Sequence, residues 1–302
     1  MGSVKAYRHR SLAERLKLYS RVRELQAAGL RPSEIGREMG MCREDVRYWL
    51  RVDQPSRNVY APDLNPRPEL AYLAGAYLGD GQTAGPQDKK VRFKLADAAF
   101  AGMLNERVAR ILGAETKSIR MERGFHCVSY DSAVLYDYLQ QPLEALQPLI
   151  DSSPAMFLRG FFDAEGHVSP RLDYSTRKFL GASLGVTNTN PDYLSCVQQL
   201  LEKLGIKSSN FRTHEVGEPM TIRGRTFIRK HEVRHLQLRG QNHAETFQAR
   251  IDFSIPAKKQ KLADFIWISK SLTMTDGYAW FVSHYELRNR RWIRDIHADT
   301  NL

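Results

Sequence analysis

The sequence has 302 residues, of which 42% are apolar and 26% charged, and these values are typical of a globular protein rather than a disordered or fibrous one. It contains no uninterrupted apolar run of about 18 residues that would span a membrane, and no cysteine pair spaced for a disulfide framework or a zinc site. The formal net charge of +11 favours a polyanionic partner such as nucleic acid. We therefore expect no membrane partner, and a location in the cytoplasm or in an organelle or nucleoid that holds the nucleic acid.

Residues 1–52 are predicted to form an all-α helix-turn-helix module. The segment "LAERLKLYSRVRELQAAGL" spaces its apolar residues like a helix and ends at Gly29, and "RPSEIGREMGMCREDVRYWLR" supplies two shorter helices with a turn at Gly40. The second helix of such a pair enters the major groove of DNA. We expect four side chains of this last helix to face outward toward DNA: Arg43, Arg47, Tyr48 and Arg51. The alternative is a small structural domain with a solvated basic face.

A linker rich in Pro, Asn and Asp follows at residues 53–68, and beyond it the chain repeats itself. The interval that separates Gly75 from Gly160 also separates Asp80 from Glu165, and "NERVARILGAETKSIR" is echoed by "VQQLLEKLGIKSSNFR". Each copy reads as a helix, two alternating segments, a helix, two more alternating segments and closing helices. The predicted fold class is α+β, with two pseudo-symmetric αββαββα halves at 69–153 and 154–265, saddle-shaped antiparallel sheets, and a C-terminal extension at 266–302.

Alternation in the predicted strands places one basic and polar face on each sheet. In "VRFKLA", Phe93 and Leu95 are expected to point toward the helices, and in "HLQLR" Leu236 and Leu238 do the same. Two such sheets side by side would form a positively charged saddle suited to a duplex. The side chains predicted to contact DNA from these sheets are Arg92, Lys94, Arg120, Arg212, His235, Gln237 and Arg239. Plain solvated strand faces are the alternative for each of them taken singly.

The two repeated helices combine small residues with an acid at the end. Helices pack backbone to backbone only where side chains are small, and the residues predicted to allow this are Gly75, Gly79, Gly160 and Ala164. If the helices run parallel, Asp80 and Glu165 meet beside the negative helix ends and repel each other, unless a divalent cation lies between them. Oxygen ligands favour Mg²⁺, which would bind together with phosphate oxygens and support phosphodiester hydrolysis.

The segments "YLAGAYLGDG" and "FLRGFFDAEG" resemble the two motifs of the single-chain LAGLIDADG homing endonucleases, and the resemblance extends over about residues 69–265. It implies a monomer that recognises a long, asymmetric site in double-stranded DNA and cleaves it across the minor groove, leaving short 3′ overhangs. It also implies that Asp80 and Glu165 bind the catalytic Mg²⁺, for which Mn²⁺ would substitute. The sequence departs from the family motif at Leu78, where the second copy keeps Asp163, and in carrying Glu rather than Asp at position 165.

The family carries a polar residue after the second strand of each half and a lysine near the active centre. By position these correspond to Asp97 in the first half and Asn188 in the second. The segment "IPAKKQKL" resembles the lysine-bearing segment and offers Lys258, Lys259 and Lys261, among which the sequence does not decide. A basic cap on the last helix is the alternative for each.

Three functions are compatible with these features. The first is a site-specific DNA endonuclease, intron-encoded or free-standing. The second is a transcription regulator that binds DNA without cleaving it, for which loss of the two acids would be expected. The third is an RNA maturase that assists intron splicing on the same fold.

Overall fold

The computed structural model describes residues 12–51, 62–82, 89–222, 224–238, 240–288 and 291–295. Its first three helices are α2 (Leu12–Ala27), α3 (Pro32–Met39) and α4 (Arg43–Arg51). They enclose a core of their own, formed by Val22, Leu25, Ile35, Val46 and Trp49. The chain turns between α3 and α4 at Gly40, whose φ of 62° lies in the left-handed region that glycine adopts without strain. The three helices expected in this segment are therefore present.

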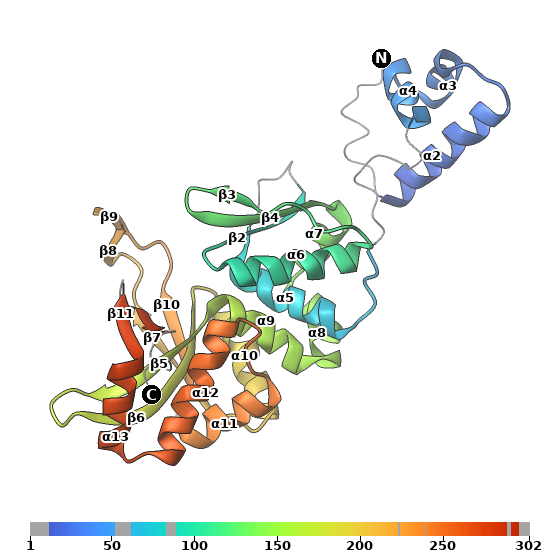
Figure 1. The fold of residues 1–302 in the computed structure, drawn as a ribbon. Helices are drawn as coiled ribbons and strands as arrows, with labels where there is room; N and C mark the ends of the chain where they lie inside the picture. The colour runs from blue at the N-terminus through green and yellow to red at the C-terminus, as the bar shows by residue number, and fades with distance from the viewer. Residues whose placement is uncertain are drawn as a thin grey trace.

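The two repeated halves follow the predicted element order (Figure 1). The first half contains α5 (Pro68–Asp80), β1 (Gly81–Gln82), β2 (Lys90–Leu95), α6 (Ala98–Leu112), β3 (Arg120–Glu122), β4 (Phe125–Asp131), α7 (Ala133–Leu139) and α8 (Leu143–Ser152). The second contains α9 (Pro154–Glu165), β5 (Gly166–Asp173), β6 (Lys178–Asn188), α10 (Pro191–Lys203), β7 (Ser208–His214), β8 (Pro219–Ile222), β9 (Arg225–Ile228), β10 (Val233–Leu238), α11 (Gln241–Arg250) and α12 (Pro256–Ser271).

The two antiparallel sheets have the same topology. The strand order is β1-β2-β4-β3 in the first sheet and β5-β6-β10-β7 in the second. Their registers also agree, because Gly81 pairs with Phe93 in the first half and Gly166 pairs with Val186 in the second. The expected fold class, a duplicated α+β unit preceded by a small all-α segment, is confirmed.

One element breaks the symmetry between the sheets. In the second half, β8 and β9 pair with each other in a separate two-stranded sheet that precedes β10. This hairpin interrupts the connection between β7 and β10, whereas the equivalent strands β3 and β4 are joined by the two residues Arg123 and Gly124. The second half therefore carries an insertion that the first half lacks.

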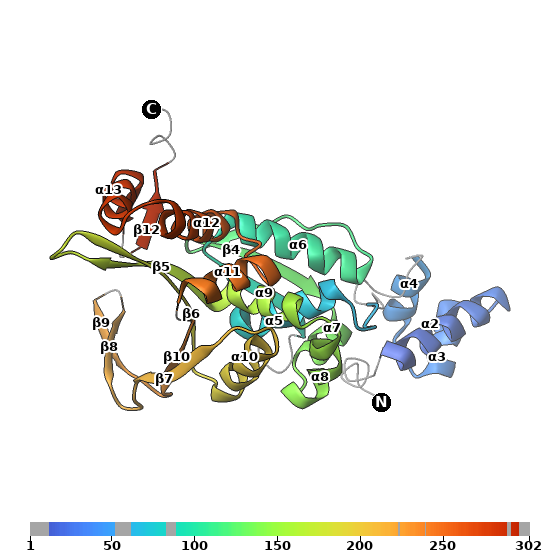
Figure 2. The same cartoon turned by 90° about the horizontal axis from the view of Figure 1, so that it is seen from below.

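Helices cover the apolar face of each sheet and leave the polar face open. The helix α6 lies against β2 and β4, while α10 lies against β6, β7 and β10 (Figure 2). Along β2 the buried side chains are Val91, Phe93 and Leu95, in the predicted alternation, and Leu236 and Leu238 are buried on β10. One continuous apolar core extends through both halves, so the repeats form a single packed body rather than two independent cores.

The chain ends in α13 (Met274–His284) and a hairpin of β11 (Tyr285–Arg288) and β12 (Arg291–Arg294). The helix α13 packs on β6, and a Cβ built at Gly277 would lie 2.6 Å from the Ile268 side chain of α12. The boundary expected at residue 265 falls inside α12, so the C-terminal elements continue the helix layer of the second half. Within the described residues, no helix combines the length and the apolar character needed to cross a membrane.

Candidate active centre

The motif helices α5 and α9 lie side by side between the two sheets (Figure 1). A Cβ added at Gly75 would collide with the backbone carbonyl of Phe157, and one added at Gly160 would collide with the carbonyl of Tyr72. Further along, a Cβ at Gly79 would lie 2.5 Å from the Cβ of Ala164. The contacts therefore advance in the same direction along both helices, which means that the helices run parallel. The four small residues lie in this seam, where the sequence predicts them.

The parallel helices end together at Asp80 and Glu165, and both carboxyls are half-buried. Burial raises the pKa of Asp80 to about 6, against the opposing effect of Lys258. Burial and the charge of Asp80 raise the pKa of Glu165 to about 7, although the amide of Asn188 donates to Glu165 Oε1 at 2.9 Å and favours the ionised form. The two acids thus repel each other in a poorly hydrated place, as two carboxylates sharing a site do.

Geometry separates the three candidate lysines. The Nζ of Lys258 donates to the carbonyls of Phe162 at 3.2 Å and Asp163 at 2.6 Å, at the C-terminal end of α9. Burial lowers the pKa of Lys258 to about 8. Four nearby carboxyls oppose this shift by raising the pKa, and two of them are Asp80 and Glu165. Lys259 instead pairs with Asp252 at 2.9 Å, and Lys261 donates to the Trp292 carbonyl at 2.6 Å. Of the three, Lys258 is the lysine whose charge lowers the pKa of both Asp80 and Glu165.

The strand register shows that Asp97 is not the counterpart of Asn188. Because Phe93 and Val186 are equivalent, the counterpart of Asn188 is the buried Leu95, two residues beyond Phe93. Asp97 instead begins α6, where its side chain accepts from the Phe100 amide at 2.8 Å. It occupies the place of Asn190, the N-cap residue of α10. Asp97 still contributes through space, as one of the four carboxyls that raise the pKa of Lys258.

Three residues near the acids carry no predicted role. Tyr72 donates from its hydroxyl to Asp163 at 2.7 Å, and both side chains are buried.

The third of these residues is His167, which follows Glu165 by two residues and stacks on His235 with 5.1 Å between ring centroids. Burial, His235 and Lys258 lower the pKa of His167 to about 4, so its imidazole is neutral near pH 7. His167 lies two residues after the motif acid, as Gln82 does in the first half, and this shared position is the sequence signal that points to it.

The donor set of the acid pair fits a hard divalent cation. Two carboxylates with raised pKa values lie at the negative ends of two helices, where positive charge would relieve their repulsion. Across the described parts of the chain, no group of three or more His, Cys, Asp or Glu side chains is placed to hold a metal. An ion at this pair would therefore complete its shell with water and phosphate oxygens, as Mg²⁺ does.

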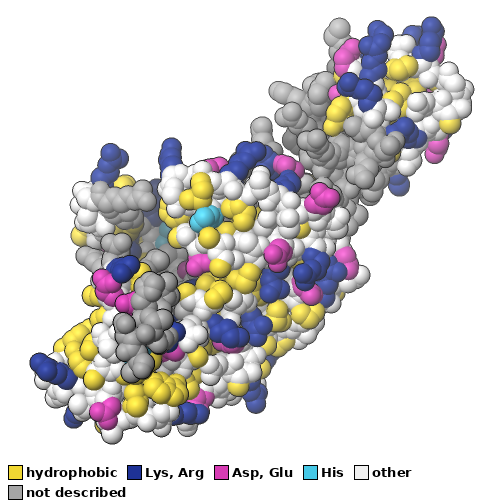
Figure 3. All heavy atoms as spheres, viewed as in Figure 1, with side chains coloured by type: hydrophobic (Ala, Val, Ile, Leu, Met, Phe, Trp, Pro, Cys, Tyr) yellow, Lys and Arg dark blue, Asp and Glu magenta, His cyan; other side chains and the backbone are white. Residues whose placement is uncertain are grey.

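The open faces of the sheets are less basic than the sequence alone indicates. Arg92 pairs with Glu122 at 2.7 Å, and Arg212 pairs with Glu215 at 2.7 Å. The Lys94 ammonium lies over the Phe125 ring, and Arg120 is exposed. On the face drawn in Figure 3, Lys and Arg side chains are interspersed with Asp and Glu. Positive charge is thus distributed over the surface, and part of it is neutralised by paired acids.

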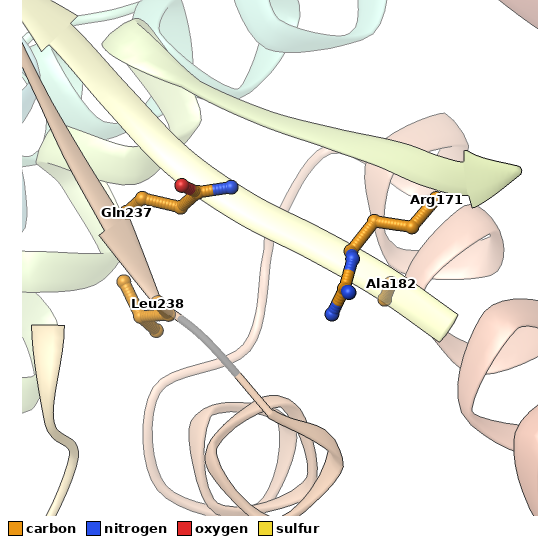
Figure 4. A pocket seen from close by; sticks show the side chains of 4 residues that line it. All are labelled: Arg171, Ala182, Gln237 and Leu238. Atoms are coloured by element: carbon orange, nitrogen blue, oxygen red, sulfur yellow. The ribbon is translucent and has the colours of Figure 1, made fainter. Parts of the chain in front are cut away.

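The polar side chains of β10 lie beside a hollow in the second sheet. Gln237 donates to the Ser183 hydroxyl at 2.7 Å, and Thr187 Oγ1 is 3.0 Å from Nδ1 of His235. Gln237 and Leu238 line the hollow together with Arg171 and Ala182 (Figure 4). Arg239, the last residue predicted to contact DNA in this strand, lies outside the described residues.

The helix α4 presents the side chains expected on its outer face. Val46 and Trp49 are buried on its inner side. The four residues predicted to contact DNA are exposed: Arg43, Arg47, Tyr48 and Arg51. This geometry is compatible with groove binding and also with a structural helical unit.

Comparison with known proteins matches residues 152–252 to the family described as LAGLIDADG-like domain. An uncharacterised protein of Methanocaldococcus jannaschii is 27% identical over 239 residues, which are 76% of this chain and 83% of that protein. A probable translation initiation factor IF-2 of Thermococcus kodakarensis is 24% identical over 258 residues, which cover 81% of this chain. The matched part is 20% of that factor's length.

Two solved structures are similar at low identity. The homing endonuclease I-DmoI in complex with DNA and Mn is 19% identical with a TM-score of 0.43, and the match covers 62% of this chain and 97% of that one. Full-length DUF199/WhiA from Thermatoga maritima is 15% identical with a TM-score of 0.43, and the match covers 75% and 69%. The second half is therefore similar to a LAGLIDADG-like domain, and the first half repeats its topology, with the two motif helices in contact.

Proposed function

We propose that this protein is a site-specific endonuclease that hydrolyses both strands of double-stranded DNA in the presence of Mg²⁺. The observation that carries the proposal is the acid pair. Asp80 and Glu165 come from two copies of one motif, end two parallel helices and hold raised pKa values beside Lys258. A stable fold gains nothing from two half-buried carboxyls, one of which raises the pKa of the other, so the presence of an acid in both copies favours a role in binding a cation.

Other side chains of this protein orient the acids and stabilise charge around that cation. Bound at the pair, a divalent cation supplies Lewis-acid polarisation of the phosphodiester and a more acidic water. Asn188 donates to Glu165 Oε1 and holds this carboxylate in one orientation. Lys258 holds a positive charge against the end of α9, where it would stabilise negative charge that develops on a phosphate. Mn²⁺ would replace Mg²⁺ because both accept oxygen ligands.

The two sheets and the hairpin β8–β9 provide the surface for a long, asymmetric target. Gln237, held by Ser183, and Arg171 carry amide and guanidinium donors of the kinds that recognise adenine and guanine edges. The hairpin lies in the second half only and exposes Arg225 and Lys230. We infer that it extends the contact at one end of the site and that α4 adds a further contact. A monomer would then bind a site without two-fold symmetry.

The decisive experiment incubates the protein with a library of DNA sites in Mg²⁺ and sequences the cleaved ends. We expect double-strand cuts with short 3′ overhangs at one site. The variants Asp80→Asn and Glu165→Gln should lose cleavage by at least about 100-fold, while Ca²⁺ should support binding without cutting. Wild-type protein that binds DNA with any divalent metal but never cuts it would overturn the endonuclease proposal and support a non-cleaving regulator. Binding restricted to intron RNA would support a maturase.

A matched pair of lysine variants tests the assignment of Lys258. Lys258→Met removes the charge held against the acid pair, and Lys259→Met removes a neighbouring charge on the same helix that pairs with Asp252. We expect the single-turnover cleavage rate to fall by about 100-fold in the first variant and to change by less than about threefold in the second. Equal losses in both variants would mean that the lysines act through general attraction of DNA.

A further inference from the structure

A buried hydrogen bond joins the two halves next to the acid pair. The hydroxyl of Tyr72, on α5, donates to Oδ2 of Asp163, on α9, at 2.7 Å. Neither side chain is accessible to solvent beyond 1%. The guanidinium of Arg107, on α6, covers the Tyr72 ring at 3.9 Å from its centroid. The bond therefore lies in a closed environment, where losing either partner leaves a polar group unsatisfied.

Asp163 also fixes the start of α12. Its Oδ1 accepts from the amide of Ser254 at 3.0 Å and from that of Ile255 at 3.4 Å, while Oδ2 accepts from Ser254 at 3.1 Å. Ile255 is the N-cap residue of α12, and its own side chain caps no amide. A carboxylate at this place satisfies amides that have no partner within the helix and interacts favourably with the helix dipole. Because the N-cap residue of α12 provides no side-chain cap, Asp163 on α9 caps the start of this helix instead.

Lys258 lies one turn into the helix that Asp163 anchors. Its ammonium donates to the carbonyls of Phe162 and Asp163. Asp163 therefore contacts α12 twice, because its carboxylate accepts from the first amides of the helix and its backbone carbonyl accepts from Lys258. The position equivalent to Asp163 in the first half is Leu78, which packs against the apolar core and accepts no hydrogen bond. Among the residues that the structure describes, the anchor and the lysine both belong to the second half.

We propose that Tyr72 and Asp163 are positioning residues that hold α12, and through it Lys258, at the acid pair. Tyr72 orients the Asp163 carboxylate, Asp163 fixes the first amides of α12, and this helix sets where the ammonium of Lys258 lies. The first half thereby controls the placement of a group that the second half provides. The effect on cleavage rests on the proposed endonuclease function, whereas the placement of Lys258 does not.

The test compares Tyr72→Phe with Tyr77→Phe. Both tyrosines lie on α5, and each hydroxyl takes part in a side-chain hydrogen bond, with Asp163 for Tyr72 and with Gln140 for Tyr77. Each substitution keeps the ring and removes the hydroxyl. The first readout is acylation of Lys258 by a water-soluble lysine reagent, followed by peptide mass spectrometry, which requires no DNA. The second is the single-turnover cleavage rate at saturating DNA, measured together with the DNA dissociation constant.

We expect Tyr72→Phe to raise acylation of Lys258 at least threefold and to lower the cleavage rate about tenfold, with an unchanged DNA dissociation constant. Tyr77→Phe should leave all three quantities within a factor of two of wild type. Asp163→Asn should show the same pattern as Tyr72→Phe with a larger amplitude. Unchanged acylation in Tyr72→Phe, or an equal rise in Tyr77→Phe, would overturn the proposal. Wild-type protein that cuts no DNA would refute the endonuclease function, while the acylation comparison would still decide the placement.

Discussion

The two halves of the core share a topology but differ in the side chains they bring to the acid pair. Strand order and register are the same, and each motif helix ends on an acid. Yet the second half places Asn188 on its acid where the first has Leu95, and within the described parts of the chain it is the second half that contributes a lysine, Lys258, to the pair. Backbone symmetry is thus maintained by packing, whereas the chemistry around the acids is free to diverge.

The symmetric part of the molecule is the helix seam, and substitutions there should affect both halves alike. Gly75→Ala and Gly160→Ala each place a Cβ against a carbonyl of the opposite helix. Since the seam is backbone to backbone, the helices must separate, and we expect each variant to lose roughly 3 kcal/mol of unfolding free energy in urea titrations, the upper range for overpacking. Similar losses in the two variants would confirm that the seam is symmetric.

Gly102, on α6, is the control for this pair. A Cβ added there meets no heavy atom within 4 Å, so Gly102→Ala should be neutral or stabilise the protein by up to about 1 kcal/mol through helix propensity. If Gly75→Ala or Gly160→Ala behaved like Gly102→Ala, the close helix contact would be wrong.

The acids should destabilise the metal-free protein as they ionise. The pKa values of Asp80 and Glu165 are raised to about 6 and about 7, so the folded state retains protons that the unfolded chain has released. The free energy of unfolding should therefore fall as pH rises from about 4 to about 8, by up to roughly 3 kcal/mol for each carboxyl. Urea titrations without metal measure this slope, and Mg²⁺ at pH 8 should restore stability by binding the ionised pair.

Variants assign this slope to the two halves. Asp80→Asn and Glu165→Gln should each reduce the slope and stabilise the metal-free protein at pH 8. Asn188→Leu, which copies Leu95, removes the hydrogen bond that favours ionised Glu165, so the pKa of Glu165 should rise further. A slope that persists after both acids are replaced would show that other groups cause it.

The features that the sequence predicts well are those that depend on local spacing. The seam glycines and the two acids follow from helical periodicity and from the alignment of one repeat with the other. The choice of Lys258 does not, because the three lysines lie on one short segment and differ only in their tertiary partners. The misplacement of Asp97 has a related cause, since strand register rather than position along the chain defines its counterpart.

The role of Tyr72 cannot be predicted from the sequence either, because it depends on a tertiary contact. Its partner Asp163 lies 91 residues away, and only the parallel contact of α5 and α9 brings the two together. A buried tyrosine on an apolar helix is otherwise indistinguishable in sequence from an ordinary core residue. Repeats therefore reveal what both halves share, whereas interactions between the halves require the structure.

The smallest expected effect concerns the hairpin that only the second half carries. A two-stranded sheet with exposed side chains is marginally stable alone, so its retention favours a partner. Replacing residues 215–232 with Arg-Gly copies the turn at Arg123 and Gly124, both of which have positive φ as a tight hairpin requires. We expect DNA affinity to fall about tenfold, or about 1.4 kcal/mol, and the footprint to shorten at one end. The cleavage rate of bound DNA should stay unchanged, because the hairpin contributes no group to the acid pair. A footprint shortened at both ends, or unchanged, would contradict an asymmetric contact by the second half.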